Sequence, residues 1–196
     1  MFRKFAKFIC RIIFGTLFKV KLIGRENIPA KGSLILCSNH KSMTDMFFIA
    51  CWIERLIYWM SKKELFKNKL LAIILRMLGS FPVLRGKTNP TTFKTAFKLL
   101  DEGHVIGIFP EGTRVRPNKP APKIRDGAAF IALKKNVDVL PVSITGKVKL
   151  FGRITVVYGK PIRLSNGSDL ELNSEILAKS SKRIMGEIYK LQGETS

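Results

Sequence analysis

The chain has 196 residues, of which 46% are hydrophobic, so it can build one domain with a core and is not intrinsically disordered. Its 35 Lys and Arg residues against 14 Asp and Glu residues give a formal net charge of +21. An excess of this size says nothing about the fold. It predicts a polyanionic partner, either a nucleic acid or an anionic membrane surface.

The cysteines and the hydropathy pattern indicate the compartment. Cys10, Cys37 and Cys51 form no C-x-x-C pair, which favours buried free thiols in a reducing compartment. The longest stretch without a charged residue, 32–40, is far shorter than the roughly 18 apolar residues that cross a bilayer. The basic N-terminus also lacks the unbroken apolar core of a signal peptide. We therefore expect no signal peptide and no transmembrane span.

Residues 1–18 have the pattern of an amphipathic helix. One side of that helix is cationic (Arg3, Lys4, Lys7, Arg11) and the opposite side is aromatic and aliphatic (Phe2, Phe5, Ile9, Ile12, Ile13). Such a helix suits the headgroup region of an anionic bilayer. The alternative is an ordinary amphipathic helix packed on its own domain. We expect 1–18 to be a membrane-association helix and 19–196 to be the main domain.

The remaining elements alternate between short apolar runs and helical patterns. Strands are predicted at 19–24, 34–37, 56–60, 81–84, 105–109, 139–145 and 154–158. Helices are predicted at 46–53, 64–78, 91–100, 127–133 and 170–191, the last interrupted by Gly186, and the proline-rich segment 115–125 is expected to be a loop that forms a flap. This order predicts an α/β fold, a single domain whose mixed, largely parallel sheet is flanked by helices.

The segment Ser38-Asn39-His40-Lys41-Ser42-Met43-Thr44-Asp45 joins a predicted buried strand to a predicted helix. Histidine is the default general base near neutral pH, and a carboxylate on one ring nitrogen orients the ring. Residues five apart on a helix differ by about 140° around its axis, so His40 and Asp45 cannot share one helical face. They can meet if His40 precedes the helix and Asp45 reaches back, with Asn39 or Ser42 as the cap. The alternative is that His40 caps the helix and the negative charge of Asp45 interacts favourably with the positive end of the helix dipole.

A second polar motif, Phe109-Pro110-Glu111-Gly112-Thr113-Arg114, follows another predicted strand. Arg114, together with Arg85, can clamp a phosphate because guanidinium matches phosphate oxygens bidentately. Gly112 allows close backbone approach, and its neighbours offer N–H donors. Glu111 either binds a second substrate hydroxyl or pairs with an arginine. Arg85 alone is equally well explained as a solvated surface residue.

No G-x-S-x-G elbow or reactive cysteine motif accompanies the His–Asp pair. A base without an enzyme nucleophile indicates that the hydroxyl it activates belongs to the substrate.

The motifs together resemble those of the glycerolipid acyltransferase family. The resemblance rests on Asn39-His40 with Asp45, on the segment 79–85, on Phe109-Pro110-Glu111-Gly112-Thr113-Arg114 and on Leu140-Pro141-Val142, in that order. It covers about residues 20–165. The family also contains enzymes that act on glycerol 3-phosphate, other lysophospholipids and lyso-aminolipids, and these motifs do not separate the acceptors.

The resemblance implies direct acyl transfer. His40, oriented by Asp45, would deprotonate the free sn-2 hydroxyl of lysophosphatidic acid, and that oxygen would attack the thioester of acyl-CoA or acyl-carrier protein. The product would be phosphatidic acid, with no acyl-enzyme, no metal and no cofactor. In the family these motifs are associated with binding the glycerol phosphate, which implies that role for Arg85 and for Glu111, Gly112, Thr113 and Arg114. The Leu140-Pro141-Val142 block would line the acyl-donor side or the core.

The resemblance also bears on location, because many relatives carry membrane spans before the histidine where this chain has one short helix. Attachment would then be peripheral or monotopic, on the cytoplasmic face of the cell membrane. A rival from another class is a non-catalytic binder of an anionic membrane or a nucleic acid; no nucleic-acid motif is present, so no nucleic-acid partner is expected. A third hypothesis is a hydrolase in which His40 activates water.

Overall fold

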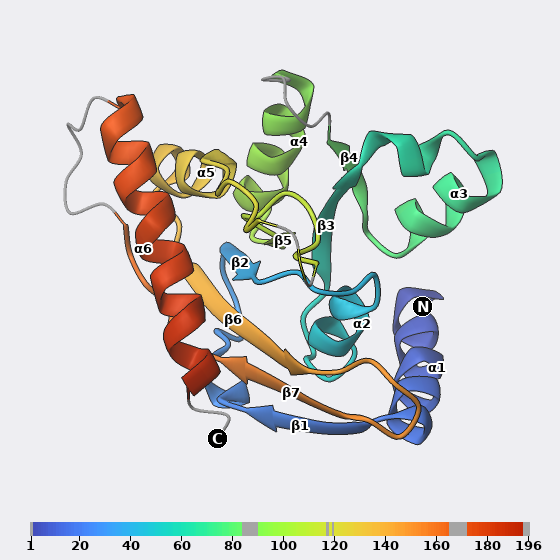
Figure 1. The fold of residues 1–196 in the computed structure, drawn as a ribbon. Coiled ribbons are helices and arrows are strands. Elements are labelled where there is room, and N and C mark those ends of the chain that lie inside the picture. The colour runs from blue at the N-terminus through green and yellow to red at the C-terminus, as the bar shows by residue number, and fades with distance from the viewer. Residues whose placement is uncertain (1, 84–89, 117, 119, 165–171, 194–196) are drawn as a thin grey trace.

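A computed structural model describes residues 2–83, 90–116, 118, 120–164 and 172–193. Across these residues the chain forms a seven-stranded sheet in the order β1-β7-β6-β2-β5-β3-β4 (Figure 1). The strands are β1 (Lys19–Ile23), β2 (Leu34–Ser38), β3 (Ile57–Lys62), β4 (Phe81–Val83), β5 (Val105–Ile108), β6 (Val139–Gly146) and β7 (Arg153–Tyr158). Only the pair β6–β7 is antiparallel, so the prediction of a mixed, largely parallel sheet is confirmed.

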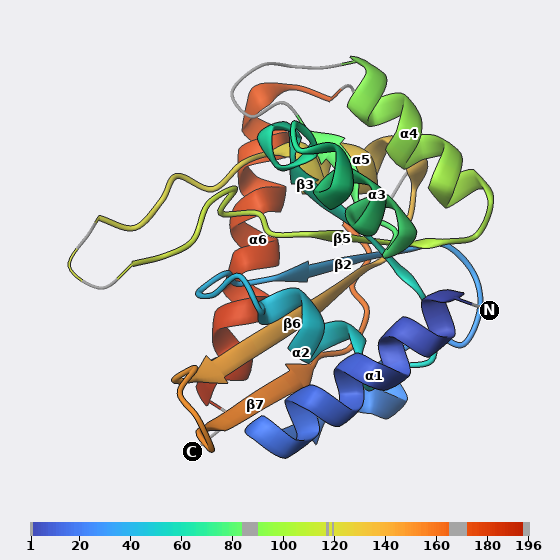
Figure 2. The same cartoon turned by 90° about the vertical axis from the view of Figure 1, so that its right-hand side faces the viewer.

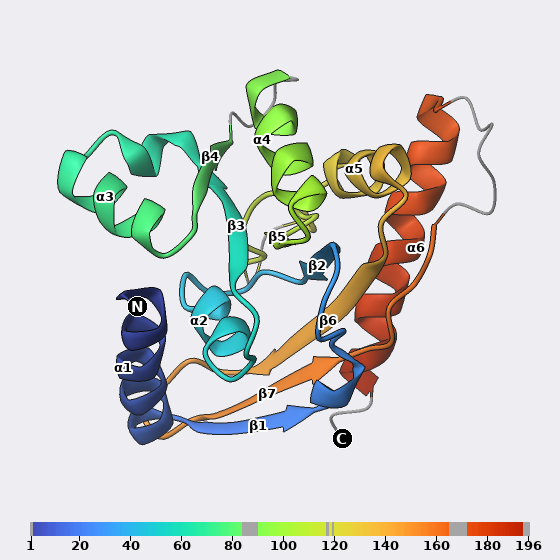
Figure 3. The same cartoon turned by 180° about the vertical axis from the view of Figure 1, so that it is seen from behind.

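Helices lie on both faces of this sheet (Figures 1 and 3). They are α1 (Phe2–Leu17), α2 (Asp45–Ala50), α3 (Lys69–Met77), α4 (Pro90–Asp101), α5 (Gly127–Lys135) and α6 (Ser174–Gly193), with the 3₁₀ turns η1 (Arg25–Asn27) and η2 (Lys63–Phe66). Helices α4, α5 and α6 cover one face, whereas α1 and α2 cover the other.

The central strand β2 shows why both faces must be covered. All five of its residues are buried, as expected for a strand in the middle of a parallel sheet. Ile35 and Cys37 face the cluster that contains Ile184 of α6, whereas Leu34 and Leu36 face the cluster that contains Phe48 of α2. The alternation of side chains along one strand therefore divides the core into two layers.

The Leu140-Pro141-Val142 block lies in β6. Leu140 and Val142 are fully buried in the core layer under α2, and Val142 pairs with Ser38 at the end of β2. The block is therefore part of the core, one of the two positions expected for it.

The predicted helix 64–78 is wrong as a continuous element. It divides into η2 and α3, because the side chain of Asn68 accepts a hydrogen bond from the backbone N–H of Leu71 and starts a new helix. The expected interruption at Gly186 is also wrong, since α6 runs through it. Buried Met185 and Ile188 on either side hold that turn against the sheet, which outweighs glycine's helix cost of about 1 kcal/mol.

The three cysteines are free thiols. Cys37 and Cys51 are buried and Cys10 is half-buried, which confirms the expected buried thiols for the first two. Burial raises the pKa of the Cys37 thiol, and it raises the pKa of Cys51 to about 12. Neither group is therefore a thiolate at neutral pH.

Candidate active site

The two polar motifs meet at one edge of the sheet because β2 and β5 are parallel neighbours. Cys37 of β2 pairs with Ile108 of β5, so both strands end at the same level. The segments 39–45 and 109–115 therefore leave the sheet side by side. In an open α/β sheet this edge, outside the carboxyl ends of the strands, is where ligands bind.

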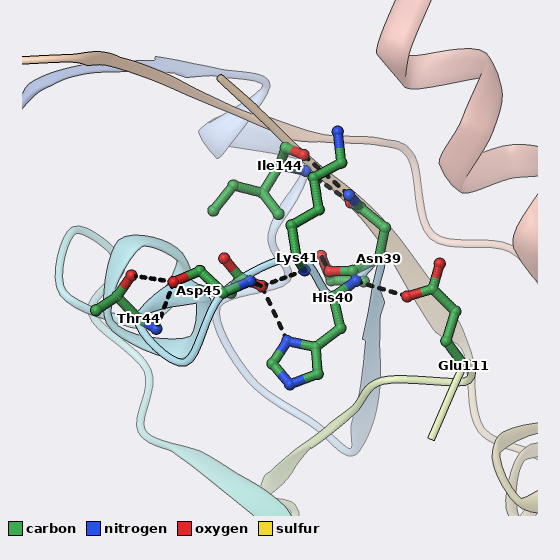
Figure 4. A network of polar contacts seen from close by, with 9 residues as sticks. Asn39, His40, Lys41, Thr44, Asp45, Glu111 and Ile144 are labelled. Carbon is green, nitrogen blue, oxygen red and sulfur yellow. Dashed lines mark hydrogen bonds and ion pairs between the residues drawn. The ribbon is translucent and has the colours of Figure 1, made fainter. Parts of the chain in front are cut away.

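His40 and Asp45 are in direct contact. The Nδ1 atom of His40 lies 2.9 Å from Oδ2 of Asp45, and the same carboxylate oxygen accepts the backbone N–H groups of Lys41 and Ser42, each at 2.7 Å (Figure 4). Asp45 is the first residue of α2, and its side chain reaches back into the preceding turn as expected. Asp45 is buried, whereas the side chain of His40 is 14% exposed.

The contact determines which ring nitrogen can act as a base. A carboxylate oxygen that already accepts two backbone N–H groups acts as an acceptor, so Nδ1 of His40 carries the proton. The other nitrogen, Nε2, then keeps a lone pair. This is the arrangement of a general base, and it differs from the alternative in which His40 caps the helix. The N-cap position belongs to Thr44, whose backbone N–H donates to Ser42 Oγ at 3.3 Å.

The ring of His40 lies in an aromatic stack. It is parallel to Phe109, with 4.0 Å between the ring centroids, and the other face of Phe109 stacks on Trp59 at 5.0 Å. Trp59 crosses directly over Gly107, where an added Cβ would lie 2.5 Å from a Trp59 ring atom. Gly107 therefore makes room for the stack, and the stack holds the plane of the imidazole.

Asn39 fixes the end of β2 just before His40. Its side-chain amide donates to the carbonyl of Ile144 at 2.9 Å, and its side-chain oxygen accepts the N–H of Ile144 at 2.8 Å (Figure 4). Asn39 is buried, so both polar atoms need these partners. The sequence suggested Asn39 only as a helix cap, and the actual partner lies on β6, far along the chain.

Glu111 contacts the backbone of His40. Its Oε2 accepts the His40 N–H at 2.7 Å (Figure 4), and the N–H of Val115 donates to the His40 carbonyl at 2.8 Å. Burial raises the pKa of the Glu111 carboxyl, and the His40 N–H opposes this in part; Tyr189 of α6 also hydrogen-bonds Glu111. Glu111 of the second motif and Val115, the residue that follows the motif, therefore hold the backbone N–H and carbonyl of His40, contacts that the sequence did not suggest.

The rest of the second motif faces solvent. Gly112 has a φ of +63°, and Thr113 and Arg114 are exposed in the turn that follows it. An added Cβ at Gly112 would lie 3.1 Å from Arg125 Cγ, so a second arginine packs beside the turn. The sequence analysis missed Arg125, although it lies at the end of the loop that follows the motif. Arg85 lies outside the described residues.

An apolar pocket lies next to the stack. It is lined by residues of α1, α2, β3 and the end of α3, among them Cys10, Phe47, Trp59 and Leu75. Trp59 links this pocket to His40 through Phe109. Among the described residues, no group of three or more His, Cys, Asp or Glu side chains is arranged to hold a metal ion.

Comparisons of the whole chain with known proteins agree with the fold and the site. Residues 19–145 match the sequence profile of the Acyltransferase family, and the chain belongs to this family of acyl-transferring enzymes. It is 30% identical, over 97% of both chains, to the 1-acyl-sn-glycerol-3-phosphate acyltransferase of Bacillus subtilis (strain 168). It is 29% identical to the enzyme of that name from Streptococcus pneumoniae, over 87% of this chain and 65% of that one.

A solved structure has the same fold. It is the crystal structure of the 1-acyl-sn-glycerophosphate (LPA) acyltransferase PlsC from Thermotoga maritima, with a TM-score of 0.71 at 26% identity. The match covers 96% of this chain and 79% of that chain. The chain spans nearly the whole Bacillus relative but about half (51%) of the chloroplastic relative from Arabidopsis thaliana.

Proposed function

We propose that this enzyme transfers an acyl group from acyl-CoA or acyl-carrier protein to the sn-2 hydroxyl of lysophosphatidic acid, giving phosphatidic acid for phospholipid synthesis. The observation that carries the proposal is the His40–Asp45 pair, held at the sheet edge beside the Glu111–Arg114 turn in a chain of this family. The names of the relatives support lysophosphatidic acid as the acceptor.

The reaction needs one base and two substrates. Nε2 of His40 takes the proton of the acceptor hydroxyl while its oxygen attacks the thioester carbonyl carbon. A C–O bond forms and the C–S bond breaks, and the proton passes from His40 to the departing thiolate. Asp45 stabilises the imidazolium that exists between the two proton transfers.

No side chain of the enzyme needs to carry the acyl group. Of the hydroxyls in the first motif, Ser38 Oγ is buried and donates to the carbonyl of Asn39 at 3.1 Å, and Ser42 Oγ hydrogen-bonds Thr44 Oγ1 at 2.9 Å. The neighbouring Cys37 is buried and its pKa is raised. These groups are poor nucleophiles, which favours direct attack by the substrate hydroxyl.

The phosphate of the acceptor would bind at the turn after β5. Arg114 is exposed there, and Arg125 lies against Gly112 from the other side. Two guanidinium groups beside a backbone turn with a left-handed glycine suit a phosphate dianion. Thr113 adds a hydroxyl, and Arg85 completes the set inferred from the sequence.

The acyl chain of the donor would occupy the apolar pocket. The pocket is lined by Trp59, which stacks on Phe109 of the His40–Phe109 pair, and it extends between α1, α2 and α3. Its lining is apolar apart from a few groups such as Lys7 and Arg55. A thioester whose chain lies in this pocket would have its carbonyl near Nε2 of His40.

Helix α1 would hold the enzyme at the anionic surface of its membrane. Within the described residues no helix is long and apolar enough to span a bilayer. Phe5, Phe8 and Ile12 are exposed, whereas Phe14 packs on Phe47 and Phe48 of α2. Self-packing therefore accounts for only part of the apolar surface of α1, and the rest is available to lipid.

One assay tests the reaction. Thiol release from acyl-CoA, and then from acyl-carrier protein, is measured with and without lysophosphatidic acid for the wild type and for His40→Ala. Release that requires the acceptor and falls by about 10² or more in the variant supports the proposal. Release that ignores the acceptor would identify a hydrolase, and no release from either donor would leave an anionic-surface binder.

A further inference from the structure

Three segments expose apolar side chains on one side of the molecule. They are α1, α3 and the turn 147–152 between β6 and β7, and we call their outward surface the docking face. In Figure 2 both helices lie toward the viewer, with the turn at the C-terminal end of α1. Leu70 and Ile73 of α3 are 70% and 53% exposed, and Leu150 and Phe151 of the turn are each 63% exposed.

Helix α3 is apolar on both of its sides. Its inner side contributes buried Ala72 and the pocket residue Leu75. Its outer side presents Leu70 and Ile73, where a surface helix of a soluble domain normally carries polar residues. The outer side therefore has no role in the packing of this domain.

The turn between β6 and β7 is unusual in its backbone as well as its exposure. Phe151 has a φ of +57°, a left-handed conformation that is rare for an aromatic residue. Its N–H donates to the carbonyl of Leu17 at 2.8 Å, and the N–H of Lys19 donates to the Gly152 carbonyl at 3.0 Å. These bonds tie the turn to the end of α1, so an exposed aromatic ring is held in a costly conformation beside the helix.

The charged residues of these three segments are all positive. None of the segments 2–17, 69–77 and 147–153 contains an acidic residue. Exposed cations on them include Arg11, Lys69, Arg76, Lys147 and Lys149. The acidic residue closest in sequence to α3, Glu64, is paired with Lys62 at 3.6 Å. Apolar groups within a cationic rim match a bilayer with anionic headgroups.

We propose that α3 and the turn 147–152 insert into an anionic bilayer together with α1, so that the enzyme docks through three segments. This goes beyond the proposed reaction, because it concerns how the enzyme is seated and not what it catalyses. The apolar pocket lies between α1 and α3. Docking by both helices places that pocket against the bilayer, where acyl chains are dissolved.

Tryptophan quenching tests the insertion. Leu70→Trp, Phe151→Trp and, as a control on the opposite side, Lys182→Trp of α6 are mixed with phosphatidylglycerol–phosphatidylcholine vesicles brominated in their acyl chains. Quenching above that of the wild type, which contains Trp52 and Trp59, is expected for the first two variants and not for Lys182→Trp. Vesicle-bound protein in which Leu70→Trp and Phe151→Trp stay unquenched would overturn the proposal.

Paired substitutions test the energetics. Leu70→Gln with Ile73→Gln, and separately Leu150→Gln with Phe151→Asn, should each weaken vesicle binding by about tenfold or more. Asparagine tolerates the left-handed conformation at 151, so the turn is kept. Lys147→Gln with Lys149→Gln should weaken binding by about tenfold on phosphatidylglycerol vesicles, whereas Lys179→Gln with Lys182→Gln on α6 should not.

Two outcomes separate this proposal from its rivals. A concentration-dependent dimer that the Leu70 and Phe151 variants abolish, with no vesicle binding, would assign the docking face to a second copy and overturn the proposal. Acyl transfer to a short-chain, monomeric lysophosphatidic acid is measured in parallel. Acyl transfer by protein whose introduced tryptophans stay unquenched would contradict the docking proposal but not the proposed function. Quenching without acyl transfer would contradict the proposed function but support the docking proposal.

Discussion

The backbone N–H of His40 donates a 2.7 Å hydrogen bond to the carboxylate of Glu111, so a side chain from one motif holds the main chain of the other. Glu111 is buried, and the bond lies on the opposite side of His40 from Asp45 (Figure 4). Asp45 orients the ring while Glu111 and Val115 fix the peptide that carries it. In the proposed reaction, the position of the base would therefore depend on both motifs at once.

Removing the Glu111 carboxylate should misplace His40. Glu111→Ala leaves the partly buried His40 N–H without this partner, a cost of about 1–3 kcal/mol, and should lower kcat more than it raises KM for the acceptor. Glu111→Gln keeps an oxygen that can accept the bond and should retain more activity. Urea unfolding and steady-state kinetics measure both effects. A pure KM effect would instead mark Glu111 as a substrate ligand.

The titration of Glu111 should appear in the stability of the fold. Burial raises its pKa in the folded protein above the ordinary value of 4.5, so the folded state binds this proton more tightly than the unfolded state. The resulting stabilisation is full below that value and is lost as the pH rises toward the folded-state pKa. Unfolding free energies from about pH 4 to about pH 7 should therefore fall more steeply for the wild type than for Glu111→Gln. Parallel curves would contradict this.

Asp45→Asn should disable the base without removing it. The oxygen that faces Nδ1 also accepts the backbone N–H groups of Lys41 and Ser42, so the amide oxygen of the variant should take its place and Nδ1 should keep its proton, while the negative charge that stabilises the imidazolium is lost. Activity should fall by about 10²–10⁴. Nitrogen NMR of labelled histidine should show the proton still on Nδ1 in the variant. A proton found on Nε2 would instead show that the amide nitrogen faces the ring and that the bonds from Lys41 and Ser42 are lost.

Gly107→Ala should break the aromatic stack. The new methyl group would lie 2.5 Å from Trp59 and 2.7 Å from Ile57, both side chains of the neighbouring strand. Overpacking of this kind costs about 1–3 kcal/mol and should displace Trp59 from Phe109. Gly127→Ala, where nothing lies within 4 Å, is the matched control and should leave stability unchanged or slightly raised. Thermal unfolding and Trp fluorescence check both variants.

Arg114→Ala and Arg125→Ala should each weaken acceptor binding. Losing a charge-assisted hydrogen bond to a phosphate costs about 1.5–3 kcal/mol, or about 10–100-fold in kcat/KM. The effect should lie in KM for lysophosphatidic acid and be smaller for an acceptor without a phosphate. Arg183→Ala, on the exposed side of α6, is the control and should have no effect. An unchanged KM in Arg125→Ala would remove that residue from the site.

Local patterns were sufficient to predict most elements. The apolar run at Leu34 and the helical spacing after Thr91 gave strand β2 and helix α4 close to their bounds. The patterns failed where a distant or competing contact decided the outcome. Asn68 divides the helix predicted at 64–78, and packing on both sides of Gly186 keeps α6 continuous.

The orientation of α1 was predictable only in part. Lys7 was expected on the cationic side of the helix, but its amine donates to the carbonyl of Ile53, and burial lowers its pKa. Its long side chain reaches the carbonyls of Ile53 and Arg55 after α2, a contact that no periodicity encodes. The aromatic residues at the end of the helix, Phe14 and Phe18, pack on Phe48 and fix the rotation of α1.

The sequence alone determined the α/β class, the order of the strands along the chain, the cationic balance and the residue types of both motifs, because periodicity, breakers and charge are local properties. The tertiary structure decided that β2 and β5 lie side by side, that Asn39 pairs with Ile144, and that Glu111 reaches the backbone of His40. Strand order and register depend on the packing of two core layers across the whole sheet. No local segment contains that information, so the site is assembled only when the sheet is complete.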